Sequence, residues 1–358
     1  MYTKKKIFKI LSCTIVYLST LIYLSILTTS AQSKIFKIED IEISEPFDAN
    51  FNKENVINKA FLVAFKELAS SIIVTKDKPK IKHSKLTEIK YLVESFEIKN
   101  ESFLDKKYVA KINVNFNKKR TLNFFEKINI FPSLKKKRDF LTILIFIDND
   151  KNQMFLFENN PFYKDWNKNT KKYFLINHIL IDEDIEDFKL INENKNNIEN
   201  FQFDKIIKKY DLDDYIVSII FKNNKELRIL SKFFFDKDLK IINKKYKDIN
   251  INDQDKLDNL ILETKTNLED LWKNNNLINT SLKLAINLQL NPKDNLKIIN
   301  LEREMEEIDL IYDYYITKIS SLNLNYKVIF NGSPKQFLKI MSEKNIIIDT
   351  ENGIWKIK

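Results

Sequence analysis

The sequence predicts an α+β protein made of several small sheet-plus-helix modules in series. Two observations lead to this fold class. Segments of alternating apolar and polar residues, which indicate half-buried strands, are interleaved with segments whose apolar residues recur every three or four positions, which indicate helices. The chain also has 358 residues, which is long enough for more than one domain.

The first module is expected over residues 34–131 with the order βαββα. Its clearest strand runs from Lys107 to Asn117, where apolar residues occupy every second position. In the first helix, Ala60 and Ala64 are small enough to allow close packing against a sheet. The expected elements are strands at 35–44, 88–98 and 107–117 and helices at 52–72 and about 122–128.

The second module is expected over residues 139–250 as a small α/β layer. Pro132 and the basic run Lys135–Arg138 indicate the boundary before it. The continuous apolar run Leu141–Ile147 is typical of a strand buried on both faces. The other expected elements are strands at 176–181 and 215–221, a helix near 203–210 and a hairpin over 226–246.

The third module is expected over residues 251–358, again as α+β. Asp253 is a suitable N-cap for the helix that opens it, and Ser333 for a shorter helix near the end. The remaining elements are strands at 282–290 and 324–330, a helix at about 301–311 and a terminal hairpin around Asn352-Gly353.

Residues 1–33 are expected to form a signal peptide or a signal anchor. Lysines at positions 4, 5, 6 and 9 precede an uncharged apolar run at 10–27, and cleavage is expected at Ala31 or Ser33. The run is also close to the length of a membrane span, so a retained anchor remains an alternative. A lipoprotein box at Cys13 is less favoured, because the apolar run continues beyond it. The sequence therefore predicts export to the periplasm, or an inner-membrane anchor with the protein facing the periplasm.

The charge of the chain does not indicate a nucleic-acid partner. The formal net charge is +10, and the four leader lysines account for four of these charges. Only four residues are arginine, whereas lysine, asparagine and isoleucine are abundant throughout. Nucleic-acid binding favours clustered basic residues on one face. We attribute the positive charge to compositional bias spread over solvated surfaces.

Three classes of site are disfavoured by residue counts. Cys13 is the only cysteine, so an intrachain disulfide is impossible. The histidines His83 and His178 are not at metal-ligand spacing, and His178, within an apolar strand, is expected to be structural. The two glycines, Gly332 and Gly353, do not form a phosphate-binding loop. No cofactor or metal is therefore expected.

Two acidic segments are candidate sites. Asp148–Asn152 resembles a calcium loop, but it lacks the required glycine and the final glutamate, so a hairpin turn is expected. The run that contains Asp184 and Asp187 follows a strand. Paired carboxylates can perform hydrolysis, so these two aspartates define the alternative function, a carboxylate-dependent periplasmic hydrolase. The competing interpretation is a solvated loop.

Phe162, Tyr163 and Trp166 form an aromatic group beside Pro161 in an expected connection. If the rings are exposed, they form a contact patch for a partner. If they are buried, they cover the sheet of the second module. The sequence alone leaves both interpretations open, with burial favoured.

The order of these segments resembles an exported proteobacterial family catalogued as "domain of unknown function twenty sixty-six". The resemblance is best over residues 34–190 and implies an exported α+β architecture. The family has no assigned activity, so no catalytic residue follows from it. The segments that carry the resemblance are the leader, the helix 52–72, Val93–Glu101, Tyr108–Asn117, Leu141–Ile147, Trp166 and Asp184–Asp187.

Together, these features predict an exported, non-catalytic interaction or assembly module that binds another envelope protein. Membrane contact is expected only through the N-terminal segment, and only if it is not cleaved.

Overall fold

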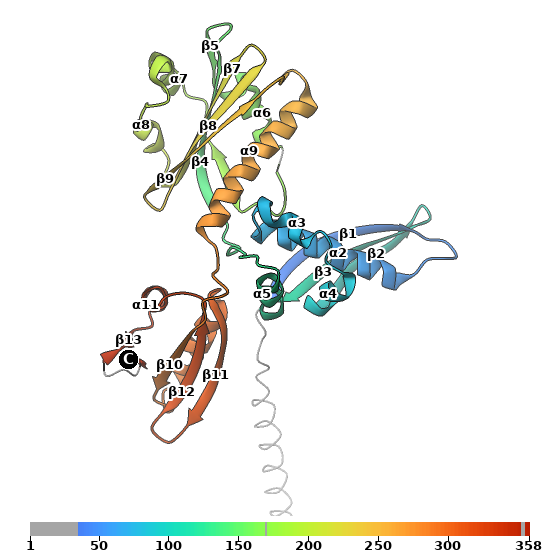
Figure 1. Cartoon of the computed structure of the whole chain (residues 1–358), viewed down its shortest axis with the longest axis vertical. Helices are drawn as coiled ribbons and strands as arrows, with labels where there is room; N and C mark the ends of the chain where they lie inside the picture. Colours follow the sequence, from blue (N-terminus) through green and yellow to red (C-terminus); the bar gives the residue numbers. More distant parts are fainter. Residues whose placement is uncertain (1–34, 169, 352–354) are drawn as a thin grey trace, which may run out of the picture.

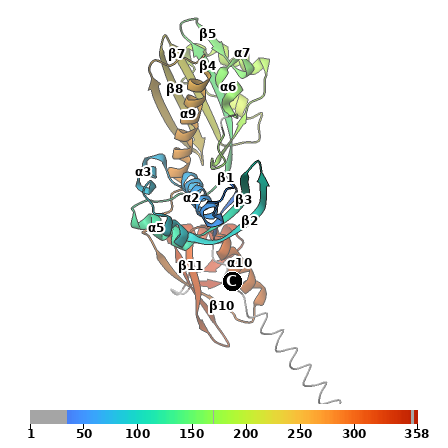
Figure 2. The same ribbon diagram turned by 90° about the vertical axis from the view of Figure 1, so that its right-hand side faces the viewer.

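The computed structural model describes residues 35–168, 170–351 and 355–358. The leader and both expected cleavage positions, Ala31 and Ser33, lie outside these ranges. The chain is α+β, with three separate sheets interleaved with helices. Figures 1 and 2 show the three sheets in three tiers along the longest axis of the molecule. In the described ranges, no helix is both long enough and apolar enough to cross a bilayer.

The first sheet has the order β1-β3-β2, with both strand pairs antiparallel. Asn52 caps helix α2 by accepting a hydrogen bond from the Glu54 amide, and the buried face of α2 includes Ala60 and Ala64. The elements of this module are β1 (Ile35–Pro46), α2 (Lys53–Ile72), η1 (Thr75–Asp77), α3 (Lys78–Ile81), α4 (Leu86–Leu92), β2 (Val93–Leu104), β3 (Lys107–Asn117) and α5 (Lys118–Lys127).

Strand β3 has the bounds and the buried face predicted from its alternation. Tyr108, Ile112 and Phe116 are buried, whereas Lys111 is exposed. The expected strand at 88–98 is partly wrong, because residues 86–92 form helix α4. In α4, Ile89 and Leu92 are buried three positions apart, which is helical spacing.

The second sheet combines parallel and antiparallel strands. Strands β6 and β7 flank β4 and run parallel to it, while β8 and β9 extend the sheet as antiparallel strands. Its elements are β4 (Arg138–Asp148), β5 (Gln153–Phe155), η2 (Phe157–Asn159), α6 (Pro161–Trp166), β6 (Ile176–Leu180), α7 (Ile185–Glu193), η3 (Lys195–Asn197), α8 (Asp204–Ile207), β7 (Tyr215–Asn223), β8 (Glu226–Phe235), β9 (Asp238–Tyr246) and α9 (Gln254–Asn275).

Each face of the second sheet has its own core. Helices α6 and α9 contribute to the core on one face, and α7 and α8 to the core on the other. Helix α9, which we expected to open the third module, packs instead on the second sheet through residues from Leu257 to Trp272. This assignment could not be made from the sequence, because an apolar stripe does not specify which sheet covers it.

The third sheet has the order β11-β12-β10-β14-β13. Strand β11 was not predicted, because most of its side chains are exposed and its apolar residues do not alternate regularly. The elements of this module are β10 (Leu284–Leu290), α10 (Asn295–Glu307), β11 (Ile311–Ile319), β12 (Leu324–Phe330), α11 (Pro334–Glu343), β13 (Ile348–Asp349) and β14 (Trp355–Ile357).

The three modules meet where the chain crosses between them. The backbone at Ser133 bridges to that at Leu277, and the Ser133 amide donates to the Ile72 carbonyl at the end of α2. The Lys273 ammonium, buried on α9, donates to the Ser70 carbonyl at 2.6 Å. The first and third modules also share one contiguous hydrophobic core. We call this region, residues 130–136 and 270–280 with the end of α2, the junction.

The junction predicts an unusual pH dependence of stability. Burial lowers the pKa of Lys273 to about 8, whereas in the unfolded chain the value is about 10.4. Between these values the unfolded chain binds more protons, so the free energy of unfolding should rise with pH. We expect Lys273 to contribute roughly 1–3 kcal/mol to this rise between pH 7.5 and 9.5 in denaturant titrations.

The variant Lys273→Met should show a weaker rise over the same range, since Lys265, whose pKa burial also lowers to about 8, still contributes. Lys245→Met, at an exposed position on β9, should keep the wild-type pH dependence. Equal slopes for the Lys273 variant and the wild type would contradict the assignment.

Candidate functional site

The two aspartates of the predicted hydrolytic site bind the same lysine. The Lys209 ammonium donates to Asp184 at 2.6 Å and to Asp187 at 2.7 Å. Asp184 is also the N-cap of α7 and accepts from the amides of Glu186 and Asp187. Lys209 and these amides lower the pKa of Asp184. The structure therefore brings the two residues together. Asp184 acts as a helix cap and as an ion-pair partner of Lys209.

The acidic run borders a small pocket of about 340 Å³, lined on one side by residues 154–157 and on the other by Glu183, Asp184, Ile185 and Phe188. Ile185 is 71% exposed. In the chain as described, no group of three or more histidine, cysteine, aspartate or glutamate side chains is placed to hold a metal ion.

The aromatic group at 162–166 lies mostly in the protein interior. Phe162 and Trp166 are each 1% exposed and belong to the core between the second sheet and α9, while Tyr163 is half-buried. Asn160 caps α6, which carries all three residues, and the Tyr163 hydroxyl donates to the Ile181 carbonyl. The interpretation of these rings as an exposed contact patch is therefore not supported by their position, because buried rings cannot reach a partner.

His178 is also buried, beside Trp166 and close to Lys265. Its Nδ1 lies 3.0 Å from the Thr142 hydroxyl oxygen, and burial holds its pKa well below the ordinary value. The imidazole is thus neutral and hydrogen-bonded within the core, as expected for a structural histidine.

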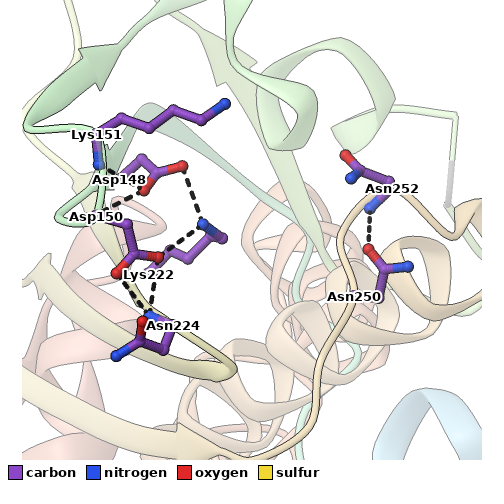
Figure 3. A network of polar contacts seen from close by, with 7 residues as sticks. All are labelled: Asp148, Asp150, Lys151, Lys222, Asn224, Asn250 and Asn252. Atoms are coloured by element: carbon purple, nitrogen blue, oxygen red, sulfur yellow. Dashed lines mark hydrogen bonds and ion pairs between the residues drawn. The ribbon is translucent and has the colours of Figure 1, made fainter.

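A polar cleft lies at the carboxyl end of β4 and β7, which are parallel and adjacent. Asp148 ends β4, and its side chain accepts from the amides of Asp150 and Lys151 across the β4–β5 turn. The Lys222 ammonium, on β7, lies 3.0 Å from both Asp148 and Asp150. Figure 3 shows this network facing the segment that carries Asn250 and Asn252.

We call this pocket of about 580 Å³ the carboxyl-edge cleft. The backbone N–H of Asn224 donates to both carboxylate oxygens of Asp150, at 2.8 and 2.9 Å. This contact and the Lys222 ammonium lower the pKa of Asp150. The carboxylates are thus held by internal partners. The residues that line the cleft are Phe146, Asp148, Lys151, Phe155, Asn159, Pro161, Lys222, Asn224, Lys225, Asp248, Ile249, Asn250, Ile251 and Asn252.

An exposed aromatic group lies where β1 ends beside the β2–β3 turn. This end of the first sheet is on the right of Figure 1. Phe47, Phe103 and Leu104, which we call the aromatic tip, are 47%, 60% and 66% exposed. The ring centroids of Phe47 and Phe103 are 4.7 Å apart, and Phe103 also contacts Tyr108. Sequence analysis missed this group, because Phe47 and Phe103 are far apart in the chain and only strand pairing brings them together.

The backbone beneath the aromatic tip is tightly held. Asp105 and Lys106 both have positive φ, 51° and 59°, as a two-residue hairpin turn requires. The Phe47 amide donates to the Lys106 carbonyl at 2.7 Å, which fixes the end of β1 against this turn. The buried Tyr108 donates its hydroxyl to Glu101 at 2.6 Å. The backbone that carries the exposed rings is therefore fixed by hydrogen bonds and by the hairpin turn.

Comparisons with known proteins leave the family open. No family model and no curated protein matches the chain. A solved structure titled as the crystal structure of an uncharacterized protein shares 6% identity, with a TM-score of 0.17. The alignment covers 39% of this chain and 91% of that one. A similarity this weak carries no argument about fold or function, and the family resemblance stated above gains no support from a family model.

The different burial of the two aromatic groups gives a direct test. Trp166→Ala should lower the free energy of unfolding by roughly 3–5 kcal/mol, because it empties a buried site. Phe103→Ala, at an exposed position, should cost less than about 1 kcal/mol. Denaturant unfolding of the two variants measures both. A larger cost at Phe103 than at Trp166 would refute the assignment of core and surface.

Proposed function

We propose that this chain is an exported, non-catalytic protein of the cell envelope that docks onto another envelope protein through the aromatic tip. The observation that carries the proposal is the exposure of Phe47 and Phe103, whose rings are in contact, together with the exposed Leu104 next to them at the β2–β3 turn. Contiguous exposed apolar groups of this kind mark interaction sites, because water contact with them is unfavourable. Export rests on the N-terminal sequence and on the stated family resemblance.

Rigidity supports docking at this position. A flexible loop would have to be ordered on binding, and that ordering costs free energy. The aromatic tip is already held by the hairpin turn at Asp105-Lys106 and by the Tyr108–Glu101 hydrogen bond. The Lys53–Glu101 ion pair at 2.6 Å lies at the same end of the sheet. Preorganised aromatic side chains are enriched at the centres of protein interfaces.

The electrostatics of the acidic groups support a non-catalytic role. A general acid that acts near neutral pH needs a raised pKa. The pKa of Asp184 is instead lowered by Lys209, and that of Asp150 by the Asn224 amide and Lys222. These shifts keep both carboxylates ionised. The alternative of a hydrolase at Asp184 and Asp187 gains no specific support from this arrangement.

In-cell photocrosslinking tests the docking surface. With benzoylphenylalanine at position 103, we expect capture of one defined protein in intact cells, because this ring is placed in the interface. The matched control carries the same photoprobe at Tyr91, which is 67% exposed on α4. The double variant Phe47→Asp with Leu104→Asp, combined with the probe at 103, should lose the capture without a large change in melting temperature. Equal capture from positions 103 and 91, or capture that survives the double variant, would refute docking at the tip.

Export is tested separately. A reporter fused after Lys358 that matures only outside the cytoplasm should be active, since the leader predicts translocation of everything after it. The same fusion with Val16, Leu21 and Leu24 changed to lysine should be inactive, because the apolar run is then interrupted. Activity of a cytoplasm-specific reporter at the same position would overturn the envelope assignment.

A further inference from the structure

We propose that the carboxyl-edge cleft binds a saccharide that carries acetamido groups. This site is separate from the aromatic tip, so the inference does not depend on how the partner protein docks. The cleft lies outside the carboxyl ends of the parallel strands β4 and β7. In open sheets with parallel strands, ligands bind at this edge, where chain connections leave room between the strands and their helices. A volume of about 580 Å³ suits a small ligand.

Four of the polar side chains that line the cleft are primary amides. Asn159, Asn224 and Asn252 are exposed, and their side chains have no hydrogen-bond partner in the described part of the protein. The Asn250 Oδ1 accepts a hydrogen bond from the backbone N–H of Asn252, and the side-chain NH2 group of Asn250 stays available. A primary amide both donates and accepts hydrogen bonds, as sugar hydroxyl and acetamido groups also do. The cleft therefore offers free donors at four positions and free amide acceptors at three of them.

Apolar side chains also line the cleft. The Phe155 ring lies 5.6 Å from that of Phe146, with 24° between the ring planes. Phe146 is buried and Phe155 is half-buried, so Phe146 supports Phe155 from within the core. Ile249 and Ile251 are half-buried and line the cleft as well. A lining with both apolar and polar side chains suits a sugar ring, which has C–H groups on its faces and polar groups around its edge, and the apolar side chains can also contact an acetamido methyl group.

The charges of the cleft are balanced. Lys222 is shared by Asp148 and Asp150, which leaves one negative charge in that network. Asp248 adds a second negative charge, and the exposed Lys151 and Lys225 supply two positive charges. The three carboxylates would repel a polyanion, and the lysines would repel a polycation. The balance therefore favours a neutral ligand with many hydrogen-bonding groups, as an N-acetylated saccharide is.

The experiment uses the purified full chain and chitotetraose, a neutral tetrasaccharide of β-1,4-linked N-acetylglucosamine, with binding measured by calorimetry. We expect saturable binding. The triple variant Asn159→Ala, Asn224→Gly and Asn252→Ala should weaken the affinity about tenfold or more, since several hydrogen bonds to the ligand are lost together. Glycine is used at position 224 because the backbone there has a positive φ of 53°, which alanine does not tolerate well. Because these side chains make no internal hydrogen bond and glycine accommodates the backbone conformation at position 224, the melting temperature should remain near that of the wild type.

The control variant changes Asn196, Asn243 and Asn274 to alanine, three exposed asparagines outside the cleft whose side chains also lack an internal partner in the described ranges. It should bind chitotetraose as the wild type does. Maltotetraose, which lacks acetamido groups, should bind at least tenfold more weakly than chitotetraose, a difference of about 1.4 kcal/mol. The inference is overturned if chitotetraose does not bind at millimolar concentration, if the cleft variant binds as well as the control, or if maltotetraose binds equally well. None of these results would affect protein capture at position 103.

Discussion

Helix α9 is the element on which the rest of this structure depends, because three charged side chains on one of its faces are buried. Lys265, Glu269 and Lys273 are spaced four residues apart and therefore lie along one stripe of the helix. Burying a charge costs free energy unless hydrogen bonds replace water. Each of the three is satisfied by backbone groups at the ends of other elements, so α9 determines where those ends lie.

The partners of these side chains show how α9 organises the second module and the junction. Lys265 donates to the Trp166 carbonyl at the end of α6, at 2.6 Å. Glu269 accepts from the amides of Leu175 and Ile176, where β6 begins. Lys273 donates to the Ser70 carbonyl near the end of α2. The ends of helices and strands leave backbone groups unpaired, and these would be costly to bury without such partners.

The junction explains how three separate sheets form one molecule while the outer end of the first sheet remains exposed. Trp272 on α9 donates its indole N–H to the Lys136 carbonyl in the connection that leads to β4. On the other side, Tyr312 of β11 donates to Asn123 of α5 at 2.8 Å, and the first and third modules share a core. These contacts lie around the junction, whereas the aromatic tip is where β1 ends beside the β2–β3 turn. In Figure 1 this end of the first sheet points away from the other two sheets. The junction thus holds the inner end of that sheet, and the outer end remains accessible.

The sequence by itself determined most of the regular elements, because apolar periodicity and capping residues are local. Strand β3 and helix α2 are where the pattern predicted them, and Asp253 and Ser333 cap helices as predicted. The burial of the charged stripe of α9 could not be predicted from the sequence, since lysine and glutamate in a helix normally face solvent. Their burial depends on unpaired backbone groups at the ends of other helices and strands. Both candidate binding surfaces were likewise decided by tertiary structure. Strand pairing brings Phe47 to Phe103, and the sheet brings Asp148 to Lys222. For Phe162, Tyr163 and Trp166 the sequence favoured burial and left an exposed patch as the alternative, because aromatic content is visible in a sequence, whereas which elements cover those rings depends on packing between distant segments.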